Sequence, residues 1–296
     1  MKTRIISGII LAVLIIGLGI PGSYPLWLIC MLCSLIGYIE LTAVLCKSAA
    51  AKKKGAVHKW NARPNLIAVP GLILTVIYYA GMMYIEWRWG LVNQTDLIRA
   101  SDFWTVMIMA LDFLLVMIVY VYTFPRRRSS QATGAVTAFL YMPVMMAYLC
   151  RTRNVPHGFF LYLLIFICAS VSDVCALAVG MAIGRHKLAP VLSPKKTIEG
   201  ALGGIAGSAI VSCLLALVLP GKLEGSAIGL FLVIGICGSI IGQTGDLAAS
   251  AIKRNNGIKD YGTLIPGHGG IMDRFDSIVF TAPVIYYLSF LLNRMI

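Results

Sequence analysis

The sequence predicts an all-α, polytopic integral membrane protein with about nine transmembrane helices. Only 12% of its residues are charged, whereas soluble domains carry about 25%. Its mean hydropathy is +0.85. Apolar runs near the length that crosses ~30 Å of hydrocarbon recur along the whole chain.

Nine apolar runs mark the expected helices. In chain order they are 5–20, 25–46, 66–86, 104–124, 136–150, 159–183, 198–219, 227–249 and 277–293. The first, fifth and ninth are short for a bilayer, so we expect them to extend into their flanks or to lie tilted. We expect the first run to be a retained anchor rather than a cleaved signal peptide, because no A-x-A-like cleavage site follows it.

The formal net charge of +13 is explained by topology rather than by a nucleic-acid partner. With a cytoplasmic N-terminus and alternating spans, the cytoplasmic segments hold 19 of the 25 Lys and Arg residues and the outer segments hold six. This distribution follows the positive-inside rule. The basic segment 47–65 could also attract anionic lipid, although a solvated topology determinant explains it equally well.

We expect one membrane domain with two parts. Residues 1–158 form N-terminal transmembrane helices with basic cytoplasmic loops, and residues 159–296 carry the candidate catalytic chemistry. Four acidic residues fall inside or at the ends of apolar runs, where each costs ~2.5–3.5 kcal/mol and calls for an explanation. They are Glu40, Asp112, Asp173 and Asp246. The eight cysteines lie mostly within apolar runs and are expected to be buried thiols rather than zinc ligands.

The most informative polar segment is 250–276, between the last two apolar runs. Its 27 residues include two Lys, two Arg, three Asp, one His and five Gly. Carboxylates can hold a metal ion, cations can bind phosphates, and glycines let backbone N–H groups approach a ligand closely. The segment therefore predicts a magnesium-dependent site for a polyphosphate at the edge of the membrane.

The end of the eighth run places four polar residues on one helix face. Asp246, Ser250, Lys253 and Arg254 are spaced i, i+4, i+7 and i+8. This face leads from a carboxylate at the membrane border to two cations. A salt-bridged helix end is the simpler alternative, although Asp246 lies too far from Lys253 for a direct i,i+4 pair.

Two carboxylates, Asp273 and Asp276, lie three residues apart at the start of the last run. One interpretation is structural, with Asp273 as a helix cap and both charges suited to the helix dipole. The other is that they lie beside Asp246 and that two or three carboxylates coordinate Mg²⁺.

Between these elements lie Lys259, Asp260 and the glycine-rich run Pro266–Gly270, which can cradle phosphate oxygens. His268 could donate a hydrogen bond to a phosphate or simply hold the loop. It has little support as a general base, since a phosphate nucleophile is already ionised.

The segment 184–204 offers a second anion-binding element. Ser193 is expected to cap a helix with Pro194 at its first position, so that Lys195, Lys196 and Thr197 stand at a helix N-terminus. Two lysines there oppose the helix dipole, which favours a bound anion. The alternative is a snorkelling positive-inside anchor.

These residues resemble the motif of the CDP-diacylglycerol synthases (phosphatidate cytidylyltransferases). The resemblance covers about residues 170–290, while the first half is only loosely similar. The matching stretches are Ser250-Ala-Ile-Lys253-Arg254, Lys259-Asp260, His268-Gly-Gly270, Asp273-Arg274-Phe-Asp276, Ser172-Asp173 and His186-Lys187-Leu with Ser193-Pro-Lys195-Lys196-Thr197-Ile-Glu199-Gly.

The resemblance implies an enzyme that transfers CMP from CTP to phosphatidic acid, giving CDP-diacylglycerol and pyrophosphate. It also implies an all-helical membrane fold with a polar funnel open to the cytoplasm and the membrane, a homodimer, and Mg²⁺ with a second cation. Asp246 and Asp273 match the carboxylates that hold the metal centre, and Asp276 matches a nearby acidic position. We expect a bacterial cell membrane protein whose N-terminus and active-site loops are cytoplasmic.

The expected catalytic residues are Asp246, Asp273, Asp276 and Lys253. The expected substrate-binding residues are Asp173, Ser193, Lys195, Lys196, Thr197, Glu199, Ser250, Arg254, Lys259, Asp260, His268 and Arg274. In the expected reaction, a phosphate oxygen of phosphatidic acid attacks the α-phosphorus of CTP in line with the leaving pyrophosphate.

Two alternatives remain open at this stage. A related enzyme could act on another lipid phosphate, such as an isoprenoid-ether or polyprenol substrate, and its loops would look alike. A transporter or channel with a phosphate-binding vestibule is the second alternative, since acids within the membrane also mark ion pathways. It predicts polar stripes through several spans and inverted repeats, and the sequence shows neither.

Overall fold

The computed structural model describes residues 23–46, 65–89, 94–218, 225–264 and 269–293, together with Gly17 and Gly19. The expected first span apart from Gly17 and Gly19, nearly all of the basic segment 47–65, and residues 265–268 with His268 lie outside the described residues.

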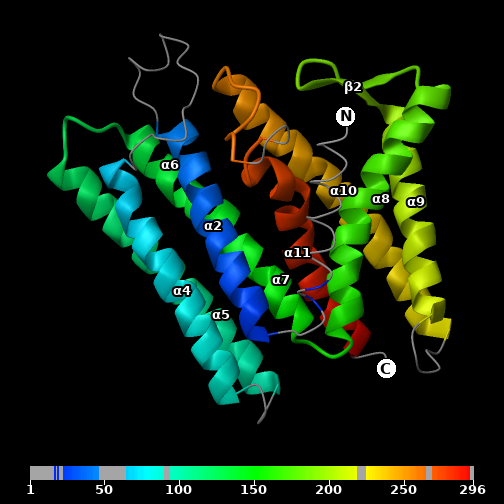
Figure 1. The fold of residues 1–296 in the computed structure, drawn as a ribbon, viewed down its shortest axis with the longest axis horizontal. Coiled ribbons are helices and arrows are strands. Elements are labelled where there is room, and N and C mark those ends of the chain that lie inside the picture. Colours follow the sequence, from blue (N-terminus) through cyan, green and yellow to red (C-terminus); the bar gives the residue numbers. More distant parts are fainter. Residues whose placement is uncertain are drawn as a thin grey trace. The chain divides into compact units, whose positions relative to one another are not determined.

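The described chain is all-α apart from one short hairpin (Figure 1). Its elements are α2 (Ser23–Leu45), η1 (Leu66–Ala68), α4 (Val69–Trp89), α5 (Gln94–Tyr122), α6 (Ser129–Phe139), η2 (Leu140–Val144), α7 (Met145–Arg153), α8 (Gly158–Ile183), β1 (Lys187–Ala189), β2 (Ser193–Thr197), α9 (Ile198–Val218), α10 (Gly225–Asn255) and α11 (Met272–Asn293).

Seven helical segments of the described residues are long and apolar enough to cross a membrane. They are Tyr24–Leu45, Leu66–Trp89, Thr95–Tyr122, Ser129–Arg153, Gly158–Ile183, Ile198–Leu217 and Ile228–Asn255. These confirm the second to eighth expected spans and the class of protein. The ninth expected run is helical as α11 but is not among the seven, so a total of nine spans stays a prediction.

The expected fifth span does extend into its flanks. It was expected over 136–150, and the helical segment runs over Ser129–Arg153. Pro143, which cannot donate a helical hydrogen bond, lies in the π-helical turn η2 that joins α6 to α7. The added residues give the segment the length that a bilayer requires.

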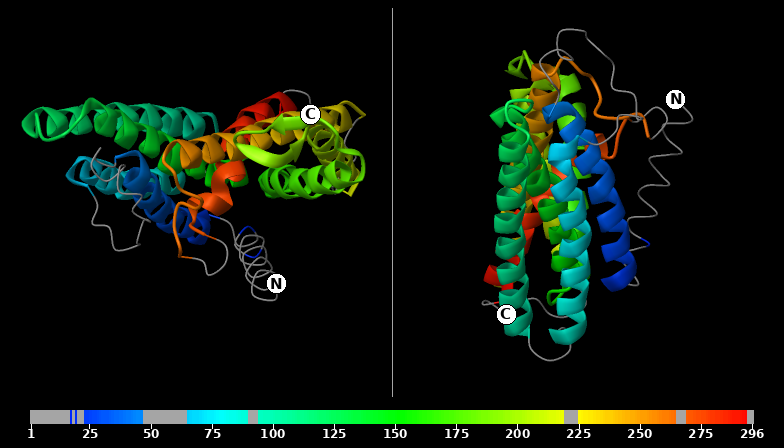
Figure 2. Two further views of the ribbon diagram at one scale, coloured as in Figure 1. Left: turned by 90° about the horizontal axis from the view of Figure 1, so that it is seen from above. Right: turned by 90° about the vertical axis from the view of Figure 1, so that its left-hand side faces the viewer.

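The chain divides into two compact units. The first unit consists of residues 1–150 and 256–274, and the second of residues 151–255 and 275–296. In the first unit α2, α4, α5 and α6 pack together (Figures 1 and 2). Its interior is aromatic: the rings of Trp27 and Tyr79 meet edge to face at 5.7 Å, and Ser34 Oγ lies 2.7 Å from the hydroxyl of Tyr79. The described parts of the polar segment, 256–264 and 269–274, belong to this unit.

The second unit is built on the packing of α8 with α9 and of α9 with α10 (Figure 1). Small residues make the close approach of α8 and α9 possible, as is usual between membrane helices. A Cβ on Gly203 would lie 2.5 Å from a methyl group of Val179, and one on Gly204 would lie 2.7 Å from the carbonyl oxygen of Ser172.

The hairpin β1–β2 corrects one prediction. The sequence predicted that a helix begins at Ser193 and Pro194, and this is wrong: residues 193–197 form strand β2, which pairs antiparallel with β1, and α9 begins at Ile198. A residue before proline is biased toward extended backbone, which suits Ser193 to a strand. Thr197 provides the cap instead, because its hydroxyl accepts the N–H of Gly200 at 3.1 Å. Lys195 and Lys196 are therefore strand residues and do not oppose the dipole of α9.

Candidate functional site

A cavity of about 650 Å³ lies within the second unit, between α8, the hairpin, α9 and α10. Its polar side chains come from α8, the hairpin and α10, and they include three lysines and two carboxylates. They are Asp173, Lys187, Ser193, Lys195, Lys196, Thr197, Gln243 and Asp246. Its apolar wall is formed mainly by α8 through Ala176, Leu177 and Met181. The cavity therefore offers a charged end and an apolar side.

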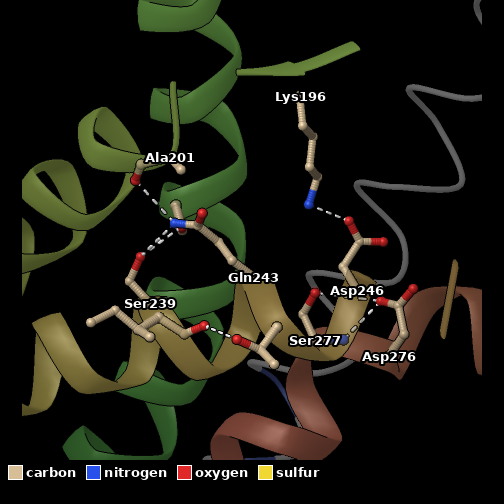
Figure 3. Close-up of polar contacts among 10 residues, drawn as sticks. Lys196, Ala201, Ser239, Gln243, Asp246, Asp276 and Ser277 are labelled. Atoms are coloured by element: carbon tan, nitrogen blue, oxygen red, sulfur yellow. Dashed lines mark hydrogen bonds and ion pairs between the residues drawn. The ribbon is translucent and has the colours of Figure 1, made fainter. Parts of the chain in front are cut away.

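An ion pair between Lys196 of β2 and Asp246 of α10 lies at the charged end (Figure 3). The two side chains are 26% and 27% exposed, so both remain within reach of a ligand in the cavity. Asp173 of α8 also lines the cavity, and its charge interacts with Lys196 and Asp246. The hairpin thus carries cations to a pair of carboxylates that stand on two different helices.

Gln243 fixes the orientation of α10 one turn before Asp246. Its Nε2 donates to the carbonyl oxygen of Ala201 on α9 at 3.2 Å and to Ser172 Oγ on α8 at 3.0 Å (Figure 3). Ser239, one turn earlier on α10, lies 2.8 Å from Ser172 through their hydroxyls. Rotation of α10 would break these contacts, so they hold Asp246 toward the cavity. Sequence reasoning missed Gln243, although an amide within an apolar run, one turn before an acid at the membrane border, was a usable signal.

Asp276 lies where α11 crosses α10. A Cβ on Gly245 would lie 2.7 Å from the carbonyl oxygen of Asp276, so the two helices are in close contact beside Asp246. Asp276 Oδ1 accepts the N–H of Ser277 at 2.8 Å, and Figure 3 shows the carboxylates of Asp246 and Asp276 on this part of the crossing. The second unit thus has Asp173 and Asp246 in the lining of its cavity and Asp276 at the crossing of α10 and α11.

Asp273 belongs to the first unit, where its carboxylate binds backbone N–H groups from two parts of the polar segment. Asp273 Oδ2 accepts the N–H of Tyr261 at 2.7 Å and the N–H of Gly270 at 3.0 Å. Gly269 beside it has φ of +83°, a conformation that a side chain would strain. Asp273 is therefore a loop-organising residue as well as a candidate ligand.

The other predicted residues are dispersed along the same segments. Ser250 is buried in α10, Lys253 is half-buried, and Arg254, Lys259 and Asp260 are exposed. Arg274 is half-buried in the first turn of α11. The predicted common face of Asp246, Ser250, Lys253 and Arg254 does lie on one helix, α10.

Glu199 does not line the cavity. Its carboxylate lies 2.6 Å from His186 Nδ1 and accepts the backbone N–H groups of Arg185 and His186, at 3.1 Å for Arg185. These contacts fasten the entry of the hairpin to the first turn of α9.

The donor set suits a hard cation. Mg²⁺ is bound by one or two carboxylates together with substrate phosphates and water. Asp173 and Asp246 supply carboxylate oxygens to the cavity of the second unit, Asp276 lies at the crossing of α10 and α11, and Asp273 belongs to the first unit. Over the described ranges, no three His, Cys, Asp or Glu side chains gather into a metal site of their own. The residues fit a metal that also binds substrate oxygens.

The fold and the cavity define a class: a membrane protein of several spans with a cavity that combines the lysines of a hairpin with carboxylates of two helices. The sequence profile of the Cytidylyltransferase family matches residues 2–292, and the chain belongs to this family.

The chain is similar to proteins named phosphatidate cytidylyltransferase. It is 31% identical to that of Bacillus subtilis strain 168 over 291 residues, 97% of each chain. It is 32% identical over 289 residues to that of Staphylococcus epidermidis strain RP62A, covering 97% of this chain and 98% of the relative. It is 44% identical to that of Synechocystis strain PCC 6803 over 143 residues, about half of each chain. The family resemblance expected from the motifs is confirmed.

Proposed function

We propose that this protein is a phosphatidate cytidylyltransferase, which transfers CMP from CTP to phosphatidic acid and forms CDP-diacylglycerol and pyrophosphate for phospholipid synthesis. The observation that carries the proposal is the similarity, over 97% of both chains, to a relative of that name. The cavity of the second unit supplies what both substrates require.

The lysines of the cavity suit the phosphate groups. Lys195 and Lys196 stand on β2, and Lys187 stands on β1, so the hairpin presents three cations to one space. A phosphate held by several such groups forms charge-assisted hydrogen bonds, which are about twice as strong as neutral ones. Lys196 can exchange its contact with Asp246 for one with a phosphate oxygen.

The apolar wall suits the lipid. Leu177 and Met181 on α8 line the cavity and are 63% and 74% exposed. Because α8 is a candidate membrane span, these exposed side chains face the environment in which acyl chains lie. A lipid phosphate can therefore reach the lysines while its chains stay in the bilayer.

The reaction requires positioning and charge neutralisation more than proton transfer. The attacking oxygen of phosphatidic acid is already ionised, so no general base is needed. Lys195 and Lys196, with Lys253, Arg254 and Lys259 from the following segments, stabilise the negative charge that grows on the pyrophosphate. Mg²⁺, when bound, would neutralise charge on the nucleotide phosphates. Asp246 and Asp273 are the residues that we assign to hold it, on the basis of the family resemblance.

We further propose an orientation and an assembly. The distribution of 19 of the 25 Lys and Arg residues supports a cytoplasmic N-terminus and cytoplasmic active-site loops. A polar funnel, a homodimer, a second cation and a bacterial cell membrane location rest on the family resemblance.

The proposal is tested by measuring pyrophosphate release and lipid product with the purified protein in detergent, CTP, phosphatidic acid and Mg²⁺. Parallel reactions with ATP, with GTP and without lipid serve as controls. CTP-selective, lipid-dependent pyrophosphate release with a CDP-lipid product supports the assignment. A folded protein without turnover would contradict it, and a panel of other lipid phosphates would then be the next assay.

A further inference from the structure

Glu40 is a fully buried carboxylate of α2 whose partners lie at the other end of the chain. Oε1 accepts the N–H of Ile271 at 3.2 Å, and Oε2 accepts the N–H of Met272 at 2.9 Å. These amides open α11, where the first N–H groups have no partner within the helix. A side chain 231 residues away from Ile271 therefore caps the helix that carries Asp273.

The polar segment is shaped around this carboxylate. A Cβ on Gly262 or on Gly270 would collide with the oxygens of Glu40. Both glycines are buried. Any other residue at these two positions would push the segment away from α2.

Gly270 links Glu40 to Asp273. Its N–H donates to Asp273 Oδ2 at 3.0 Å, and its Cα is packed against the carboxylate of Glu40. Asp273 Oδ2 also accepts the N–H of Tyr261, which is fully buried. The two carboxylates thus hold the same backbone, and their charges interact. If the carboxylate of Glu40 moved, the backbone at Gly270 would move with it, and the carboxylate of Asp273 would change its direction.

We propose that Glu40 is a positioning residue for the reaction: from α2 it fixes the backbone of Gly262 and of residues 270–272, and thereby the direction in which Asp273 presents its carboxylate. The kinetic part of this proposal rests on the proposed function, whereas the hold of Glu40 on the segment does not. A carboxylate serves this purpose better than a neutral group, because charge-assisted hydrogen bonds are shorter and stronger. The sequence marked Glu40 only as an acid within a span.

The test compares Glu40→Gln, Glu40→Asp and a matched control, Asp112→Asn, in the full-length protein in detergent. Asp112 is also a fully buried acid in a span of the first unit, but no hydrogen bond joins its oxygens to the described residues. Hydrogen exchange of peptides from 261–274 is measured without substrate. The kcat and the KM values for CTP and phosphatidic acid are then measured with Mg²⁺.

Glu40→Gln is expected to speed exchange in 269–274 by about 10- to 100-fold, because two bonds to a charged acceptor are weakened. It is expected to lower kcat by roughly 100-fold, since small misplacements of reacting groups cost that much, with the KM for phosphatidic acid nearly unchanged. Glu40→Asp keeps the charge, so its exchange in 269–274 and its kcat are expected to lie between those of Glu40→Gln and the wild type. Asp112→Asn is expected to leave exchange in the segment and kcat as in the wild type.

Wild-type exchange in Glu40→Gln would overturn the proposal. So would faster exchange with an unchanged kcat, since Glu40 would then act on stability alone. If hydrogen exchange is fast in every peptide of Glu40→Gln, this variant has lost its fold. The proposal is then tested with Glu40→Asp, by its exchange in 269–274 and its kcat. If the wild type transfers no CMP, the proposed function fails, while faster exchange confined to 269–274 would still support the hold of Glu40 on the segment.

Discussion

Asp246 is the residue on which the site depends most directly, because it meets Lys196 at the charged end of the cavity. Asp246→Asn keeps its shape and removes its charge. We expect kcat to fall by about 10²–10³-fold, the range seen when a group that stabilises transition-state charge is lost. Thr244→Ala is the control, since Thr244 is exposed on α10 and its hydroxyl donates to the carbonyl oxygen of Ile240 in its own helix at 2.8 Å. Wild-type kcat in folded Asp246→Asn would remove Asp246 from the metal assignment.

Lys196 tests the phosphate-binding role of the hairpin. Lys196→Met removes the cation while keeping much of the side-chain volume. A charge-assisted contact contributes ~1.5–3 kcal/mol, so kcat/KM for CTP is expected to fall by about 10- to 100-fold. Arg185→Gln changes a cation that does not line the cavity and should leave kcat/KM within about twofold, as for surface charges away from a site. Equal losses in the two variants would indicate a general effect of charge near the membrane.

At the scale of elements, the start of α9 is set by Thr197 rather than by Ser193. Thr197→Ala removes the hydroxyl that accepts the N–H of Gly200 and is expected to lower the free energy of unfolding by ~1 kcal/mol. Ser193→Ala should have a smaller effect, because Ser193 pairs in β2 through its backbone. Denaturant unfolding in detergent, followed by helical circular dichroism, measures both. A larger loss of unfolding free energy in Ser193→Ala than in Thr197→Ala would indicate that the helix begins at Ser193, as the sequence predicted.

The packing of α8 against α9 depends on glycine in a way that a matched pair can measure. Gly203→Ala would place a methyl group 2.5 Å from a Val179 methyl carbon, and we expect a loss of ~1–3 kcal/mol from overpacking. Gly229→Ala has open space around its new methyl group and should be neutral or slightly stabilising, since alanine favours helix by ~1 kcal/mol. The measurement is the unfolding midpoint of each variant in the same detergent, and Gly203→Ala is expected to have the lower one. Equal midpoints would mean that the α8–α9 contact is looser than described.

At the scale of the whole molecule, the sequence predicted what depends on neighbouring residues. Seven spans followed from local apolar length, and the common face of Asp246 and Lys253 followed from helical spacing. The start of α9 was predicted wrongly because Ser193-Pro194 fits a helix start as well as a strand, and only pairing with β1 selects the strand. The contacts of Glu40 with Ile271 and Met272 join residues 231 and 232 positions apart, a separation over which no periodicity carries information.

The orientation of the chain is the remaining property that belongs to the whole molecule, and the placement of its cations decides it. Segment 125–135 carries three arginines and is expected inside, whereas segment 151–158 is expected outside. Ser130 and Pro156 are exposed positions in these segments, so Ser130→Cys and Pro156→Cys report on opposite faces. In intact cells, a membrane-impermeant maleimide should label Pro156→Cys alone, and after permeabilisation it should label both. The unaltered protein is the control, since all eight of its cysteines are free and none is exposed. Labelling of Ser130→Cys alone in intact cells would reverse the topology and place the lysine-rich cavity on the side of the membrane without CTP.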